Sequence, residues 1–277
     1  MTNDHPKLQR LSPNGKRPGF PERALLLGGL FLAALPALAD TLRFEEAIAR
    51  SPGQNAPLYR ERHWTRYQDG RASERLVLYL CPNGTPFGRK HVDYRVSAQA
   101  PSFEFTDARS GYREGLRRIA GKASIWFHEA RNGERSAAIT ASRLVADAGF
   151  DVFIRSQWPA LTSGQSVALS FAVPARLGSL DFKLRKVAQA NIAGESAHVF
   201  RLSLGGWLGL IAPAIDVSYG KDSQRLLRFE GMSNLRDDAG RKQLVARIDF
   251  PARDQGATDA DWRAASSLPL AACRVRD

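Results

Sequence analysis

Few residues of this chain stand at spacings that support a known chemistry. His128 and Glu129 begin like the zinc-binding pattern His-Glu-x-x-His, but Asn132 stands where the second histidine is needed. The stretch 84–90 holds the glycine and lysine of a phosphate-binding loop at the wrong spacing. The Gly-x-Ser-x-Gly motif of one large class of serine hydrolases is missing. The sequence therefore predicts no catalytic residue, no metal site and no cofactor, and it favours a protein that is not an enzyme.

The two cysteines, Cys81 and Cys273, are the one pair with an evident chemistry. In an oxidising compartment such a pair favours a disulfide, which would tie the end of the chain to its first third. The alternative is two separate thiols. Because the sequence has no Cys-x-x-Cys, redox catalysis has no support.

Two polar clusters, 107–114 and 230–237, place opposite charges around predicted turns. They could form a polar rim that orients the head group of a ligand. The competing interpretation is ordinary turn hydrogen bonding with cross-strand ion pairs. The candidates for the polar rim are Arg109, Arg113, Glu230 and Asn234.

The elements that must position these residues follow a period of two from Leu58 onward, the period of half-buried strands. Turn signals such as Asp69-Gly70, typical of a type I′ hairpin, separate the runs. The pattern predicts a mainly β protein, with an antiparallel meander of about ten strands that forms a curved sheet or open barrel. This single β-rich domain is expected to cover 57–250.

One segment, 147–161, has apolar residues at helical spacing and predicts a single inserted amphipathic helix that Pro159 ends or kinks. Such a helix would cover one face of the sheet or plug an open barrel, and a cavity beneath it could hold an apolar ligand. A dry core would contain the same residues. The candidate lining is Phe150, Phe153, Trp158, Phe182 and Leu184, with Trp207 near an entrance.

The ends of the chain carry compartment signals. Basic residues, an apolar run of about 15 residues, shorter than the roughly 20 that span a bilayer, and the triplet Ala37-Leu38-Ala39 predict a cleavable signal peptide at 1–39. The mature chain is then expected in a bacterial periplasm, without a transmembrane segment. Residues 40–56 predict a short helix and a connector, and 251–277 a polar C-terminal tail.

The net charge of +12 comes from 40 basic and 28 acidic residues that alternate along the chain. This interleaving is typical of a solvated surface, although an anionic lipid or polymer is a second interpretation. No nucleic-acid recognition motif is present, and an exported protein does not normally meet nucleic acid.

A signal peptide, a long antiparallel meander, one inserted amphipathic helix and a late hairpin together resemble the periplasmic lipoprotein-carrier type of half-barrel. The resemblance lies in architecture, over most of 57–250, and no family motif matches residue by residue. The chain also resembles uncharacterised exported β-rich proteins of proteobacteria. The resemblance to the lipoprotein carriers implies a protein that binds or carries a lipid-like ligand, with a lipid or lipoprotein as partner. The alternatives are a structural or interaction protein of the cell envelope with a filled barrel, and a hydrolase with an unrecognised site.

Overall fold

The computed structural model describes residues 41–205, 214–251 and 255–275 of the 277-residue chain. The predicted signal peptide at 1–39 and the predicted entrance residue Trp207 lie outside the described residues. The strands are β1 (Thr41–Arg50), β2 (Pro57–Gln68), β3 (Arg71–Leu80), β4 (Pro86–Asp93), β5 (Ser102–Asp107), β6 (Tyr112–Ile119), β7 (Lys122–Glu129), β8 (Gly133–Ala138), β9 (Leu144–Val145), β10 (Val167–Val173), β11 (Gly178–Ile192), β12 (Glu195–Leu204), β13 (Ile215–Gly220), β14 (Leu226–Arg236), β15 (Gln243–Asp249) and β16 (Gln255–Gly256). The helices are α1 (Gly149–Ser156), α2 (Trp158–Thr162) and α3 (Asp259–Ser267), with a 3₁₀ turn at Pro174–Arg176.

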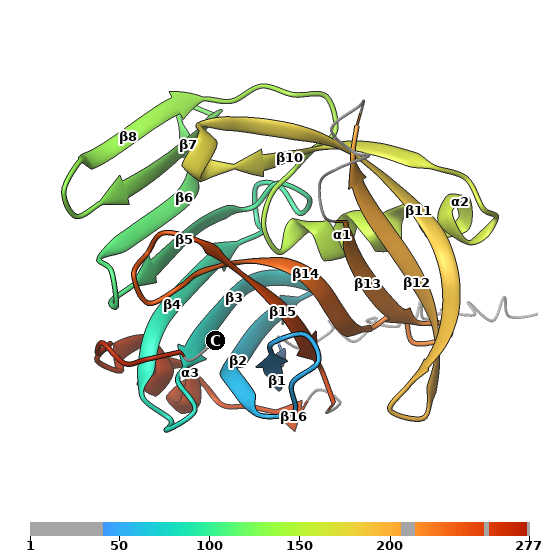
Figure 1. Cartoon of the computed structure of the whole chain (residues 1–277). Coiled ribbons are helices and arrows are strands. Elements are labelled where there is room, and N and C mark those ends of the chain that lie inside the picture. Colours follow the sequence, from blue (N-terminus) through green and yellow to red (C-terminus); the bar gives the residue numbers. More distant parts are fainter. Residues whose placement is uncertain (1–40, 206–213, 252–254, 276–277) are drawn as a thin grey trace, which may run out of the picture. The chain divides into compact units, whose positions relative to one another are not determined.

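The described strands form one 16-stranded sheet built from two antiparallel meanders (Figure 1). The first meander runs from β1 to β8 and the second from β10 to β15, and β1 pairs with β15 to join them. The strands β8 and β9 are the free ends of this order, so the sheet curves without closing into a barrel. The mainly β, curved and open architecture is confirmed.

The predicted number of about ten strands is wrong, because the sheet has 16. Strands β1, β8, β9 and β16 lie where the sequence pattern predicts none. Two of them, β9 and β16, have only two residues each, too few to show a period. The strand β9 also pairs with β10 in parallel, which a simple meander does not predict.

The helix predicted within 40–56 is also wrong, because Thr41–Arg50 is the strand β1. Apolar residues at 44, 47 and 48 fit a helix when read alone. In the sheet, Phe44 packs on the outer face with Trp64, and Ala47 and Ala49 are fully buried on the opposite face. Pairing with β2 along the whole strand, and with β15 at its end, overrides the weak local preference.

The first hairpin matches its prediction in detail. Asp69 and Gly70 have φ angles of 49° and 73°, and a type I′ turn requires positive φ at both central residues. The turn sets the register in which Gln68 faces Arg71. Residues that lie opposite each other on β2 and β3 therefore point to the same side of the sheet, and every second pair shares that side.

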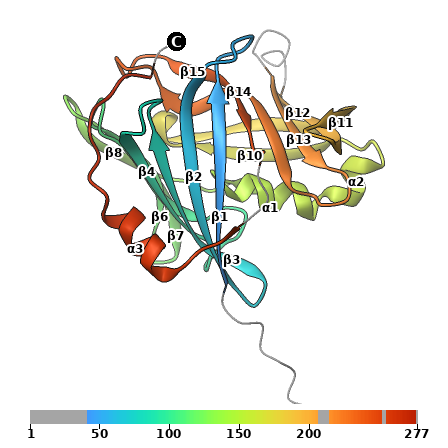
Figure 2. The same ribbon diagram turned by 90° about the horizontal axis from the view of Figure 1, so that it is seen from below.

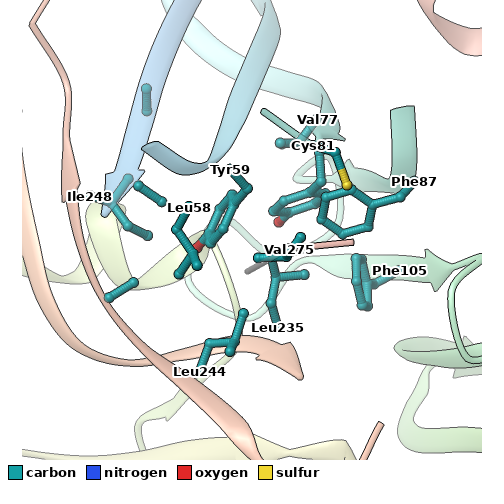
Figure 3. Close-up of a cluster of buried hydrophobic side chains, with 14 of the residues drawn as sticks. Leu58, Tyr59, Val77, Cys81, Phe87, Phe105, Leu235, Leu244, Ile248 and Val275 are labelled. Carbon is teal, nitrogen blue, oxygen red and sulfur yellow. The ribbon is translucent and has the colours of Figure 1, made fainter. Parts of the chain in front are cut away.

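The sheet has an inner face, which meets α1 and α2, and an outer face, which meets α3 (Figures 1 and 2). The inner core beside β1–β5 includes Tyr59, Tyr79 and Phe87, and the second meander and the end of the chain add Ile248 and Val275 (Figure 3). The core is thus contributed by both meanders together.

The polar tail predicted for 251–277 is wrong in part, because it contains the helix α3 on the outer face (Figure 2). Thr258 and Asp261 form a reciprocal capping box at its start. Ala265 is buried against Trp64 and the outer side chains of β3, with Trp262 beside them. Beyond α3, Cys273 forms the predicted disulfide with Cys81, across a separation of 192 residues.

The helix predicted at 147–161 is present but divided in two. The first part ends at Ser156, and α2 begins at Trp158 with Pro159 in its first turn, where a missing amide proton costs nothing. A Cβ atom on Gly149 would overlap the carbonyl oxygen of Gln99, so a glycine permits this close approach of α1. None of the described helices has both the length and the apolar character needed to span a membrane.

Candidate functional site

The inner face of β10–β13 carries an apolar cluster beneath the two helices, here called the apolar half. The strand register places alternate side chains on this face, as where Leu202 faces Leu184 and Phe200 faces Val217. From the helices, Phe153, Ile154 and Leu161 pack into it. The buried members of the apolar half are Val145, Phe153, Ile154, Leu161, Val167, Leu169, Leu184, Phe200, Leu202, Val217 and Tyr219.

Several aromatic side chains of the apolar half stay only half-buried. Phe150 of α1 meets Phe171 edge to face at 6.2 Å between ring centroids, and Phe171 meets Phe182 in the same way at 6.4 Å. Trp158 of α2 packs against Phe200 at 5.4 Å. These half-buried rings follow the seam between the helices and the sheet.

Five of the six predicted lining residues come together here, and the sixth, Trp207, lies outside the described residues. Phe153 is 2% exposed and Leu184 fully buried, so both belong to the packed interior. The other three, Phe150, Trp158 and Phe182, are half-buried around them. The partners Phe171 and Phe200 were not predicted as lining residues, although both lie in predicted strands.

The inner face of β2, β3, β4 and β6 differs sharply, because titratable side chains occupy it. This part of the inner face is here called the charged half. The strand register brings its side chains together, since Val77 lies opposite both His63 and Lys90, and Thr65 lies opposite Arg75. Strand alternation could have revealed these positions, since residues 59, 61, 63, 65 and 67 share one face in the sequence pattern. The titratable members of the charged half are Tyr59, Glu61, His63, Arg75, Tyr79, Lys90, Tyr94, Tyr112 and Glu114, with Asp147 from the segment before α1.

Lys90 and Asp147 form a buried ion pair at the entry to α1. Lys90 Nζ donates to Asp147 Oδ1 at 2.7 Å, and the two side chains are 11% and 9% exposed. Burial alone would lower the pKa of the Lys90 ammonium, but attraction to Asp147 outweighs it and holds that pKa above the ordinary value. Asp147 has a φ of 43°, so the pair fixes the left-handed turn that starts the helical segment.

His63 and Glu61 form a second buried pair, with 2.8 Å between His63 Nε2 and Glu61 Oε2. The ring of His63 lies 5.8 Å from that of Phe250, centroid to centroid. A carboxylate that orients an imidazole occurs in general-base sites. Among the described residues, no hydroxyl or thiol forms a hydrogen bond with His63.

Glu114 and Tyr112 form a third polar contact, in which Tyr112 Oη donates to a Glu114 carboxylate oxygen at 2.7 Å. Burial raises the pKa of the Glu114 carboxyl to about 7, although the hydrogen bond from Tyr112 opposes the shift. Glu114 therefore changes charge near neutral pH inside the protein.

The four predicted rim residues do not form one rim. Arg109 is buried with ion pairs to Asp107 and Asp238, and its guanidinium lies 4.1 Å from the ring centroid of Phe87. Arg113 lies on the outer face beside Trp126, with an ion pair to Glu104.

The other two rim candidates lie on β14. Glu230 is exposed, and Asn234 Nδ2 donates to Tyr79 Oη at 3.4 Å on the inner face. The ion-pair interpretation therefore describes Arg109 and Arg113. Arg109 lies in the turn between β5 and β6, and Arg113 lies on β6. On β14, the register shifts between Met232 and Arg236, which separates Glu230 from Asn234.

Two surface pockets lie away from both halves. One of about 550 Å³ is lined by the ends of β11, β14 and β15, including Arg225 and Asp249. The other, of about 290 Å³, lies over the strands β4–β8 around Trp126. Neither includes a predicted cavity-lining residue.

No protein-family model and no curated protein matches this chain. Solved structures that resemble it include MucB in complex with MucA(peri), at 13% identity and a TM-score of 0.31, over 80% of this chain and 53% of that one. A β-barrel-like protein of a domain of unknown function, DUF1849, from Brucella abortus aligns at 6% identity and a TM-score of 0.39, over 79% and 98% of the two chains. A lipoprotein-sorting protein domain from Vibrio parahaemolyticus aligns at 10% identity and a TM-score of 0.24, over 80% and 88%.

This chain thus spans about half the length of the MucB chain. At these identities and TM-scores the likenesses assign no function.

Proposed function

We propose that this chain is an exported, periplasmic protein that binds an apolar, lipid-like ligand in the apolar half, beneath α1 and α2. The observation that carries the proposal is the row of half-buried rings along the helix–sheet seam, Phe150, Phe171, Phe182 and Trp158. A contiguous apolar surface that the protein itself leaves partly uncovered favours an apolar ligand.

The attachment of the helices supports the same function. Three polar contacts tie α1 and α2 to their surroundings: Lys186 Nζ to the Thr162 carbonyl at 3.1 Å, Arg155 to the Gln224 carbonyl at 3.4 Å, and Gln99 to Ser156 at 3.2 Å. The remaining contact is packing, which has no fixed direction and adjusts to an inserted chain more easily than a hydrogen-bonded ladder. Burial of an acyl chain against the rings would gain about 25 cal/mol per Å² of apolar surface.

The second candidate function is an envelope interaction protein with a filled interior. It is favoured by the complete burial of Ile154, Leu161 and Leu184, which together fill the centre of the apolar half. The two functions differ in one measurable respect, since a filled protein carries no lipid and gains no affinity for one.

Native mass spectrometry of protein purified without detergent tests the proposal. We expect added mass that dissociates as a lipid, and we expect delipidated protein to bind a fatty acid. Phe182→Ser should weaken this binding about tenfold. Val245→Ser, at a 47% exposed position of β15, is the matched control and should leave binding unchanged. A bare polypeptide mass together with no fatty-acid binding would refute the proposal and favour the filled protein.

A further inference from the structure

Arg75 of the charged half is an arginine on the inner face without a carboxylate partner. Its Nε donates to Thr65 Oγ1 at 3.1 Å, and within the described part of the chain it forms no ion pair. Arg109, a second arginine with a buried side chain, differs because it forms ion pairs with both Asp107 and Asp238. Arg75 is half-buried, and the other donors of its guanidinium have no partner among the described residues, so they are available to an added anion.

A second unpartnered polar group lies in the same neighbourhood. Tyr94 is 4% exposed, and its hydroxyl has no hydrogen-bond partner. Burial lowers the pKa of the Arg75 guanidinium, but the phenols of Tyr94 and Tyr67, and after them the carboxylates of Glu45 and Asp147, hold that pKa above the ordinary value. Asp147 is itself neutralised by Lys90 at 2.7 Å, so it leaves Arg75 a surplus of positive charge.

The position of Arg75 links it to the apolar half. Val92, which lies opposite Arg75 on the next strand, belongs to a buried cluster against which Val152 of α1 packs. The next residues of α1, Phe153 and Ile154, pack into the apolar half. The unpartnered donors therefore lie close to the place where α1 joins the charged half to the apolar half.

We propose that Arg75 and Tyr94 form a recognition site for the oxyanion head group, a carboxylate or phosphate, of an anionic amphiphile. This inference rests on the proposed function, because the acyl chain of the same ligand would lie in the apolar half. A guanidinium presents parallel N–H donors that match two oxygens of a carboxylate or phosphate. The hydroxyl of Tyr94 supplies one further donor. The site thereby selects anionic over neutral lipids.

The test compares two probes with the same chain, oleate and the neutral methyl oleate, on delipidated protein. We expect wild-type protein to bind oleate at least tenfold more tightly than methyl oleate. Arg75→Gln should remove this preference while methyl oleate binding is kept, and Tyr94→Phe, which preserves the packed ring, should reduce it severalfold. Arg185→Gln removes the same charge at an exposed position of β11 and should retain the full preference.

Each of the following outcomes refutes either the head-group site or the proposed function on which it rests. Equal binding of oleate and methyl oleate by wild-type protein leaves the apolar site intact and refutes the head-group site. A preference that survives in both Arg75→Gln and Tyr94→Phe refutes it too. Binding of neither probe refutes the proposed function and the inference with it. If inorganic phosphate alone raises the melting temperature of wild-type but not of Arg75→Gln protein, and oleate does not bind, the site takes a free oxyanion and the amphiphile is refuted.

Discussion

The two halves of the inner face use the same strand geometry for opposite interiors. In the apolar half, the side chains of β10–β13 are covered by α1 and α2 and consist of aliphatic and aromatic residues. In the charged half, pairs such as Lys90–Asp147 and Glu61–His63 are buried among tyrosines. The comparison shows that a sheet admits charge on its inner face where neighbouring strands and segments supply the opposite charge.

The two halves therefore draw their stability from different sources. The apolar half gains free energy in proportion to the surface removed from water, and every lost methyl group leaves a cavity. The charged half gains little net energy from its pairs, but removal of one partner leaves an uncompensated charge inside. Substitutions can test this contrast directly.

The largest effect is expected for the disulfide that joins Cys81, the buried residue directly after β3, to the segment after α3. Closing a loop over a separation of 192 residues restricts the unfolded chain and contributes on the order of 4–5 kcal/mol. Cys273→Ser should lower the free energy of unfolding by this amount in urea titrations. The double variant Cys81→Ser/Cys273→Ser should lose no more free energy of unfolding than Cys273→Ser alone. A loss below about 1 kcal/mol for Cys273→Ser would contradict the stabilising role of the disulfide.

Next in size is the removal of one partner of a buried pair in the charged half. Lys90→Met should cost about 3–5 kcal/mol, because Asp147 is left buried without a countercharge. The double variant Lys90→Met/Asp147→Asn should recover most of this loss, and Asn still tolerates the left-handed backbone at 147. Denaturant titrations of Lys90→Met, Asp147→Asn and the double variant give the coupling energy. Equal losses in Lys90→Met and the double variant would contradict the contrast between the halves.

A core truncation in the apolar half should cost somewhat less. Leu184 is fully buried, so Leu184→Ala should lower the free energy of unfolding by about 3 kcal/mol, through lost transfer energy and a residual cavity. Val245→Ala, at a 47% exposed position of β15, is the control and should stay within about 0.5 kcal/mol. No coupled substitution should restore this loss as Asp147→Asn does for Lys90. A cost of Leu184→Ala no larger than that of the control would show that the apolar half is loosely packed.

The smallest effect depends on pH. The pKa of Glu114 is about 7 in the folded protein, against an ordinary value of 4.5. Its protonated form therefore stabilises the fold below about pH 4.5, and this contribution is lost as the pH rises through 7. Glu114→Gln keeps the neutral form and should raise stability at pH 8 relative to wild type, by at most about 3 kcal/mol, with little change at pH 4.

Unfolding measured at the two pH values checks this prediction for Glu114. Glu134→Gln, at an exposed position of β8, is the control and should not alter the pH dependence. If Glu114→Gln has the same pH profile as wild type, Glu114 is ionised inside the protein and the charged half is better hydrated than its burial implies.

Much of the fold is predictable because it depends on local periods. The alternation from Leu58, the Asp69-Gly70 turn and the helical spacing around Phe153 each correspond to an element of the right type. The errors arise where tertiary contact decides. The strand β1 is stabilised by pairing with β2 and β15, and the helix α3 packs on an outer face whose apolar character could not be foreseen from the tail itself.

The sequence by itself determined the class of fold, the position of the helical insertion, the apolar candidates and the cysteine pair, because each depends on spacing along the chain or on residue type. Only the tertiary structure decided which side chains meet. Lys90 and Asp147 are 57 residues apart, and Arg109 and Asp238 are 129 residues apart. Such pairs depend on how two meanders join through β1 and β15, and no local pattern encodes that junction. For the same reason the pairings inside the charged half, and the place of Arg75 beside α1, became visible only in the folded chain.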